Sequence, residues 1–152
     1  MAGISETPQH CWPVLAAWLP LLQESLAKQG HFRWRLQGVS MLPTLPSDCE
    51  IDIVPAPDVV PLGALIVFAS GSTLVTHRLV YRTREFLVTQ GDSRGEPDPW
   101  LRPEQVVGVV SAAYRDGRHI WPGKRERLMR WRWLGRAYLL RLTRPVRRQA
   151  AH

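Results

Sequence analysis

Residues 38–45 read GVSMLPTL, which places Ser40 between a glycine turn and a rigid Met-Leu-Pro segment. A serine hydroxyl in such a turn can be held out from the backbone, where it could act as a nucleophile. A serine before an apolar run more often caps or solvates the end of a strand, so this octapeptide is weak evidence by itself. The residues on either side of it decide between the two interpretations.

Short strands are predicted on both sides of the turn. Before it, Phe32, Trp34 and Leu36 alternate with polar residues, and this period of two predicts a half-buried strand that ends near Ser40. Many short strands separated by Gly- and Pro-rich turns are typical of a mainly β (α+β) domain. Five further apolar runs follow the octapeptide, at residues 51–54, 64–68, 73–81, 86–89 and 106–113.

The two ends of the chain have helical patterns. Apolar residues at three- and four-residue spacing predict a helix over 13–28, which Pro20 should bend. With 152 residues the chain suits one compact domain. We expect three segments in it: an N-terminal helical segment (1–30), a β core (31–122) and a basic helical tail (123–152).

A candidate base and two candidate acids follow Ser40. The imidazole of His77 could accept the proton of an attacking serine and return it to the leaving amine. A carboxylate on the other ring nitrogen would fix the tautomer, and Asp92 and Asp98 are both candidates. Both lie in a proline-containing stretch, 92–104, that we expect to form a loop over the sheet edge. Either aspartate could instead make only turn hydrogen bonds.

These blocks, in this order, resemble the signal peptidase and LexA-like superfamily of serine peptidases. Residues 40–45 match its Ser-Met-x-Pro-Thr-Leu signature, and residues 61–68 match the Gly and apolar strand that come next. Bacterial signal peptidases and LexA-like proteins have a lysine base after this strand. Residues 77–80, His-Arg-Leu-Val, instead resemble the His-Arg-Val segment of the endoplasmic-reticulum and archaeal type.

Two later blocks extend the resemblance over residues 33–112. Gly91-Asp92 matches the family's Gly-Asp block, and residues 107–110 match its Val-Gly-x-Val strand. The resemblance implies a catalytic β core of coiled antiparallel sheets and a serine endopeptidase. It also implies roles for Ser40 as nucleophile and His77 as base, and the Gly-Asp match slightly favours Asp92 over Asp98 as the acid.

The resemblance also implies an oxyanion hole and a substrate groove. The backbone N–H of Ser40 is the expected oxyanion donor. Bacterial signal peptidases add a serine hydroxyl two residues earlier, where this chain has Gly38, so a second donor is left open. Substrates of the family bind extended, as an added strand beside the serine. We expect edge strands around Gly38 and 64–68 to bind them, in a groove lined by Met41, Pro43, Leu65 and Val67.

Neither a signal peptide nor a transmembrane helix is expected. Residues 1–10 contain no Lys or Arg, and the apolar stretch 12–22 has about half the length needed to span a bilayer. We therefore expect a cytoplasmic protein, soluble or peripherally bound to a membrane. Its expected substrate is the leader or signal segment of a precursor, and the missing anchor favours a leader-bearing peptide.

The formal net charge is +7, and ten of the twenty Lys and Arg residues lie in residues 124–148 beside one acid, Glu126. This tail could be the charged outer face of a packed helix, or it could bind an anionic membrane surface. Nucleic acid is an unlikely partner because no recognised binding motif is present. Cys11 and Cys49 show no zinc-like spacing, so we expect free thiols and neither metal nor cofactor.

Two other functions are compatible with these motifs. A LexA-like regulator that cleaves itself would use the same serine, although only about 30 residues precede the core and no helix-turn-helix fits there. A catalytically silent peptide-binding or membrane adaptor would use the same groove and tail. The sequence does not indicate an oligomeric state.

Overall fold

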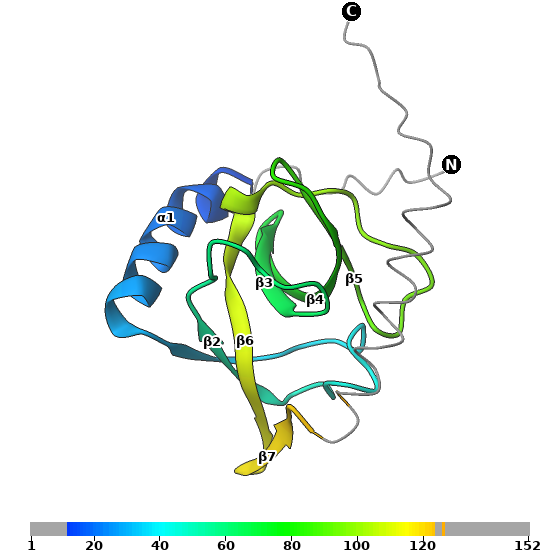
Figure 1. Cartoon of the computed structure of the whole chain (residues 1–152). Coiled ribbons are helices and arrows are strands. Elements are labelled where there is room, and N and C mark those ends of the chain that lie inside the picture. Colours follow the sequence, from blue (N-terminus) through cyan, green and yellow to red (C-terminus); the bar gives the residue numbers. More distant parts are fainter. Residues whose placement is uncertain (1–11, 124–125, 127–152) are drawn as a thin grey trace, which may run out of the picture.

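The structure is a computed structural model that describes residues 12–123 and residue 126 (Figure 1). The predicted helix and strands are present, so the mainly β interpretation is confirmed, whereas β7 was not predicted. The elements are α1 (Trp12–Gln29), β1 (Phe32–Arg35), β2 (Glu50–Val54), β3 (Leu65–Ser70), β4 (Thr73–Arg82), β5 (Leu87–Gln90), a 3-10 turn (Pro103–Gln105), β6 (Val106–Arg115) and β7 (Arg118–Trp121). The predicted helix after residue 123 lies outside the described residues, apart from Glu126.

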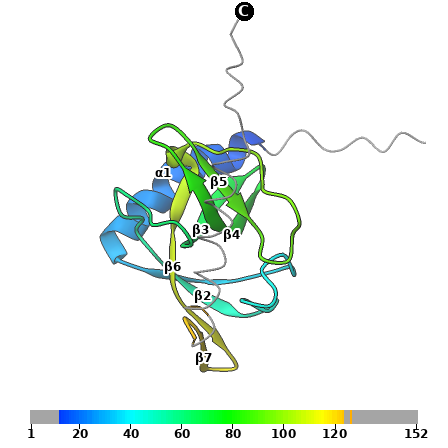
Figure 2. The same ribbon diagram turned by 45° about the vertical axis from the view of Figure 1, so that its right-hand side comes forward.

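All seven described strands belong to one antiparallel sheet with the order β1-β2-β6-β3-β4-β5, in which β7 also pairs with β6. Strand β6 joins the two halves of this sheet, because its residues 106–109 pair with β3 and its residues 109–114 pair with β2. Figures 1 and 2 show β6 running past both the curled β3–β5 half and the β1–β2 half. The expectation that 64–68 forms an edge strand is wrong, because β3 lies between β6 and β4.

Strand β1 is an edge strand and is less buried than its alternation predicts. Phe32 is partly buried, but Trp34 is 45% exposed. Exposed charges of β1 pair with acids of β2: Arg33 Nε donates to Asp52 Oδ1 over 2.7 Å. Hydrogen bonding to Arg33 lowers the pKa of the Asp52 carboxyl. Because Trp34 is exposed, its indole is available on the surface, where it lines the same groove as Ser40.

The core has two parts, one on each face of β3. Side chains alternate along a strand, so Leu65 and Val67 face one way while Ile66 and Phe68 face the other. The first pair packs with Leu26, Leu36, Met41, Leu45, Cys49, Ile51, Ile53, Val107, Val110 and Ala113. The second pair packs with Val60, Leu79, Leu87, Leu101 and Val106. Cys49 is a buried free thiol, and Cys11 lies outside the described residues.

Helix α1 packs against the sheet through Leu26, which is 2% exposed and belongs to the first core cluster. The side-chain amide of Gln23 donates to the carbonyls of Glu104 and Val106, over 3.0 and 2.7 Å. The helix runs through Pro20 and ends where the N–H of Gly30 donates to the carbonyl of Leu26. Within the described part of the chain, no helix has the length and apolar character needed to cross a membrane.

Replacing Leu26 by alanine should remove the main apolar contact between α1 and the sheet. We expect Leu26→Ala to lower the free energy of unfolding by about 2–4 kcal/mol, because the helix cannot fully close the cavity. The matched control is Leu21→Ala on the same helix, where the side chain is 53% exposed. Urea unfolding followed by tryptophan fluorescence measures both; equal losses would contradict this docking of α1.

Candidate active site

Ser40 lies in the turn that follows β1, and the chain around it is held from both sides. The N–H of Leu36 donates to the carbonyl of Cys49, and Gly38 has a φ of 93°, a left-handed conformation that favours glycine. After Ser40 the chain turns tightly, with the Leu45 N–H donating to the Met41 carbonyl over 2.9 Å. Met41 and Leu45 are anchored in the core, so the Ser40 side chain faces outward.

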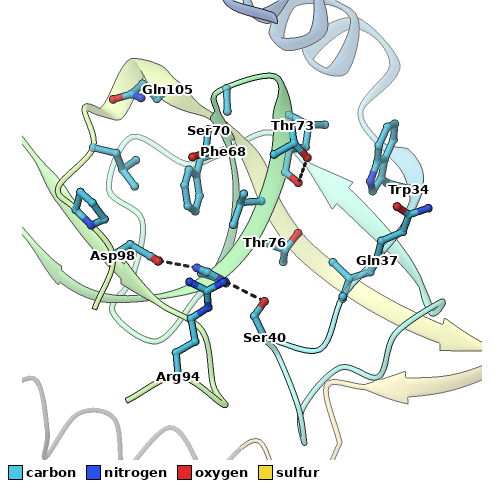
Figure 3. A pocket seen from close by; sticks show the side chains of 18 of the residues that line it. Trp34, Gln37, Ser40, Phe68, Ser70, Thr73, Thr76, Arg94, Asp98 and Gln105 are labelled. Carbon is cyan, nitrogen blue, oxygen red and sulfur yellow. Dashed lines mark hydrogen bonds and ion pairs between the residues drawn. The ribbon is translucent and has the colours of Figure 1, made fainter. Parts of the chain in front are cut away.

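Ser40, His77 and Asp98 form a continuous hydrogen-bonded line (Figure 3). The Oγ of Ser40 lies 3.0 Å from Nε2 of His77, and Nδ1 of the same ring lies 2.5 Å from Oδ2 of Asp98. A carboxylate only accepts hydrogen bonds, so this contact places the imidazole proton on Nδ1 and leaves Nε2 to accept from the serine. The structure thus brings together three side chains from the turn after β1, from β4 and from the loop after β5.

Asp98 is fixed by further contacts that favour its ionised form. Thr89 Oγ1 donates to Asp98 Oδ2 over 2.7 Å, and the Asp98 N–H donates to the carbonyl of Thr89. Burial raises the pKa of the Asp98 carboxyl, but the hydrogen bonds from His77 and Thr89 and the nearby charge of Arg94 outweigh it. The pKa of Asp98 is therefore lowered, which keeps a negative charge beside the imidazole.

The preference for Asp92 as the acid beside His77 is wrong. His77 and Arg78 are neighbours on β4, so their side chains point to opposite faces of the strand. Asp92 contacts Arg78, with its two carboxylate oxygens 2.8 Å from Nε and 2.7 Å from Nη2. Asp92 therefore neutralises the buried arginine, and Asp98 is the carboxylate that reaches the histidine.

Arg78 is the centre of a buried polar network that the sequence did not reveal. Its side chain has no exposed surface, and it also donates to the carbonyl of Gly63 and to Oε1 of Glu126. The hydroxyl of Thr44, in the Ser40 octapeptide, donates to Asp92. Burial lowers the pKa of Arg78, but hydrogen bonds to Asp92 and Glu126 outweigh it and raise the pKa. The network ties the octapeptide, β4 and residue 126 together.

The turn after β5 lies directly against Ser40. The N–H of Ser93 donates to the carbonyl of Ser40, and the Ser93 hydroxyl donates to the carbonyl of Val39, both over 3.0 Å. A Cβ added to Gly91 would lie 2.7 Å from the Ser40 carbonyl oxygen and 3.1 Å from His77 Nε2. Only glycine fits this close approach, which is a physical reason for glycine at position 91.

The expected oxyanion donor is the backbone N–H of Ser40. It donates to no acceptor within the described part of the chain, and it belongs to the same residue as the candidate nucleophile. Gly38 offers only main-chain groups to this region. A carbonyl oxygen bound above Ser40 could therefore accept at least one preorganised main-chain hydrogen bond.

A groove with a volume of about 830 Å³ opens beside these residues. Residues 34–40, from the end of β1 through Ser40, line it together with residues 73–77 of β4, and Phe68, Arg94 and Trp100 also contribute. Figure 3 shows Ser40 with Trp34 and Gln37 on one side and Arg94 and Asp98 on the other. Because the groove lining includes the first half of β4, an extended segment could lie along that strand.

The prediction that four residues line the groove is wrong for Met41, Leu65 and Val67. It is not supported for Pro43. Met41 is 1% exposed, and Leu65 and Val67 are fully buried in the first core cluster. Met41 packs in the first core cluster, and Leu65 and Val67 lie on the face of β3 opposite to Phe68. Pro43 is exposed but does not line the groove.

Comparison with known proteins gives no family assignment. Neither a scan against protein-family models nor a search of curated proteins finds a match for this chain. Among the residues that the structure describes, no group of three His, Cys, Asp or Glu side chains could hold a metal ion. The chemistry of the site therefore has to be argued from its own geometry.

The Arg78 network predicts unequal roles for its two acids. Asp92→Ala should lower the free energy of unfolding by about 3 kcal/mol, because it removes the bidentate partner of a fully buried cation. Glu126→Ala should cost about 1 kcal/mol, because Arg78 keeps Asp92. Urea unfolding of both variants measures the difference; a larger loss for Glu126→Ala would show that the network is anchored from residue 126 instead.

Proposed function

We propose that this chain is a signal-peptidase-like serine endopeptidase that removes a leader or signal segment from a precursor peptide or protein. The observation that carries the proposal is the line from Ser40 Oγ to His77 Nε2 (3.0 Å) and from His77 Nδ1 to Asp98 (2.5 Å). These are the contacts that a serine nucleophile, its base and an orienting acid require. The resemblance of the octapeptide and of the histidine block to signal peptidases supports the substrate class.

In the proposed reaction, Ser40 Oγ attacks the scissile carbonyl carbon while His77 Nε2 accepts the hydroxyl proton. The negative charge that forms on the carbonyl oxygen is stabilised by the Ser40 N–H. His77 then gives its proton to the leaving amine as the carbon–nitrogen bond breaks. Water, deprotonated by the same imidazole, attacks the resulting ester, and His77 returns that proton to Ser40 Oγ as the bond between this oxygen and the carbonyl carbon breaks. Asp98 holds the ring and stabilises its protonated form throughout.

The pairing of β4 supports binding of an extended substrate. Residues 73–77 pair with β3 on one side, whereas pairing with β5 on the other side begins only at Arg78. Among the described residues, no strand pairs with the first half of β4 on that side, and residues 73–77 line the groove. A peptide strand added there would place its backbone beside Ser40, and the apolar side chains of Phe68 and Val75 would contact its side chains.

Substitution of the three residues tests the proposal on a randomised peptide library, with products mapped by mass spectrometry. We expect Ser40→Ala and His77→Ala to lower kcat/KM by about 10⁴-fold or more, and Asp98→Asn by about 10³–10⁴-fold. A fluorophosphonate label should modify Ser40 in the native protein.

Three results would point elsewhere. Equal cleavage by all four proteins would refute the assignment. Peptide binding without cleavage, together with an unlabelled Ser40, would favour a silent peptide-binding adaptor. Fragmentation of the chain itself at one site, lost in Ser40→Ala, would favour a self-cleaving regulator.

Gly91→Ala tests how closely the turn after β5 must approach the catalytic groups. We expect its kcat/KM to fall by about 100-fold, because the added methyl group displaces the Ser40 carbonyl and the His77 ring. The matched control is Gly95→Ala, where an added Cβ meets no atom within 4 Å. Similar activity of the two variants would contradict the close approach.

A further inference from the structure

Arg94 places a positive charge at the groove beside the Ser40–His77–Asp98 line (Figure 3). Its side chain is exposed, and it makes no hydrogen bond or ion pair with the described residues. Its charge nevertheless acts on Asp98, whose pKa it helps to lower. The contacts of Asp98 with His77 and Thr89 both use Oδ2, and no described residue accepts a hydrogen bond from the Arg94 guanidinium, so its donors can bind a ligand.

The backbone that carries Arg94 is held in place. Gln90 is fully buried, and its side-chain amide donates to the Arg94 carbonyl over 2.7 Å. The Arg94 N–H donates to the carbonyl of Gly91 over 3.0 Å, and the neighbouring Ser93 is bonded to Ser40. This turn therefore fixes the start of the Arg94 side chain relative to the nucleophile, which lowers the entropy lost when the side chain binds a ligand.

The position of Arg94 corresponds to the leaving-group side of the groove. In the proposed reaction His77 returns a proton to the leaving amine, so the residue after the cleaved bond must lie on the His77 side of Ser40. Figure 3 shows Arg94 and Asp98 on that side, whereas Trp34 and Gln37 lie on the other side of Ser40. Arg35 also lines the groove, but it follows Trp34 in the chain, and its Nη2 lies 3.6 Å from Oε1 of Glu50.

We propose that Arg94 is a specificity-determining residue that binds a carboxylate immediately after the cleaved bond. A planar guanidinium can donate two parallel hydrogen bonds to a carboxylate, and this geometry is more selective than a point charge. The carboxylate could belong to an Asp or Glu side chain or to the free C-terminus of a short leaving peptide. This inference rests on the proposed function, because that function defines the leaving side.

The test uses one peptide library for both cleavage and binding. The library contains N-acetylated random peptides, in one pool with free and in one with amidated C-termini. In the cleavage experiment, the library is incubated with the native protein, with Arg94→Gln or with Arg35→Gln. In the binding experiment, peptides are selected with Ser40→Ala and with the double variant Ser40→Ala/Arg94→Gln. Mass spectrometry identifies the products and the bound peptides.

We expect peptides with Asp or Glu after the cleaved bond to be cleaved about tenfold faster than their Asn or Gln counterparts. Arg94→Gln should abolish this ratio, and Arg35→Gln should keep it. Arg94→Glu should instead favour Lys at that position. A preference confined to the free-C-terminus pool would assign the carboxylate to the end of the leaving peptide.

Several results would overturn the inference while leaving the peptidase proposal intact. One is cleavage without any preference for acids; another is an acid preference that survives Arg94→Gln. A third is a kcat that falls equally for acidic and neutral peptides in Arg94→Gln, which would indicate that Arg94 stabilises the oxyanion. If no peptide is cleaved but acidic peptides are still selected and this selection depends on Arg94, the peptidase proposal is refuted and the carboxylate site is supported. If no peptide is cleaved or selected, both proposals fail.

Discussion

The ion pair between Arg78 and Asp92 is the contact on which the geometry of the site depends. Arg78 follows His77 on β4, so fixing the arginine on one face of the strand also fixes the imidazole on the other. Asp92 binds Thr44 of the Ser40 octapeptide as well. A single carboxylate thus sets the position of the Ser40 turn against the strand that carries His77. A fully buried cation is tolerated here because every part of its fork has an oxygen acceptor.

The turn and loop after β5 bring three different contributions to one place. Gly91 allows the close approach to Ser40 and His77, Arg94 supplies a positive charge, and Asp98 orients the imidazole. The segment has little regular structure, yet its hydrogen bonds to Ser40, Val39 and Thr89 hold it to the rest of the domain. Loops held on a rigid sheet in this way commonly carry the functional residues of a fold.

Much of the fold could be predicted because its signals are local. Short apolar runs at 51–54 and 106–113 predicted strands, and the three- and four-residue spacing before Gly30 predicted the helix. Ser40 and His77 could be selected because each lies in a short motif. The choice between Asp92 and Asp98 could not be made from sequence, because it depends on which face of β4 each loop residue reaches.

The groove lining was mispredicted for a related reason. A residue's place next to Ser40 in the sequence does not show which way its side chain points, and Met41 points into the core. Arg94 carried no signal at all, since an isolated arginine in a polar loop looks the same whether it faces bulk solvent or a groove. Trp34 was expected to be half-buried because alternation cannot show that a strand lies at an edge.

Along residues 73–77, β4 pairs with no described strand on the side away from β3, and binding at this edge would change the stability of the domain. A bound peptide strand would complete the backbone hydrogen bonding of β4 only in the folded protein. By linkage, occupancy would then raise the free energy of unfolding as ligand concentration exceeds the dissociation constant. Release of that peptide would return the sheet to its less stable form, so occupancy of the edge and local stability would rise and fall together in the first half of β4.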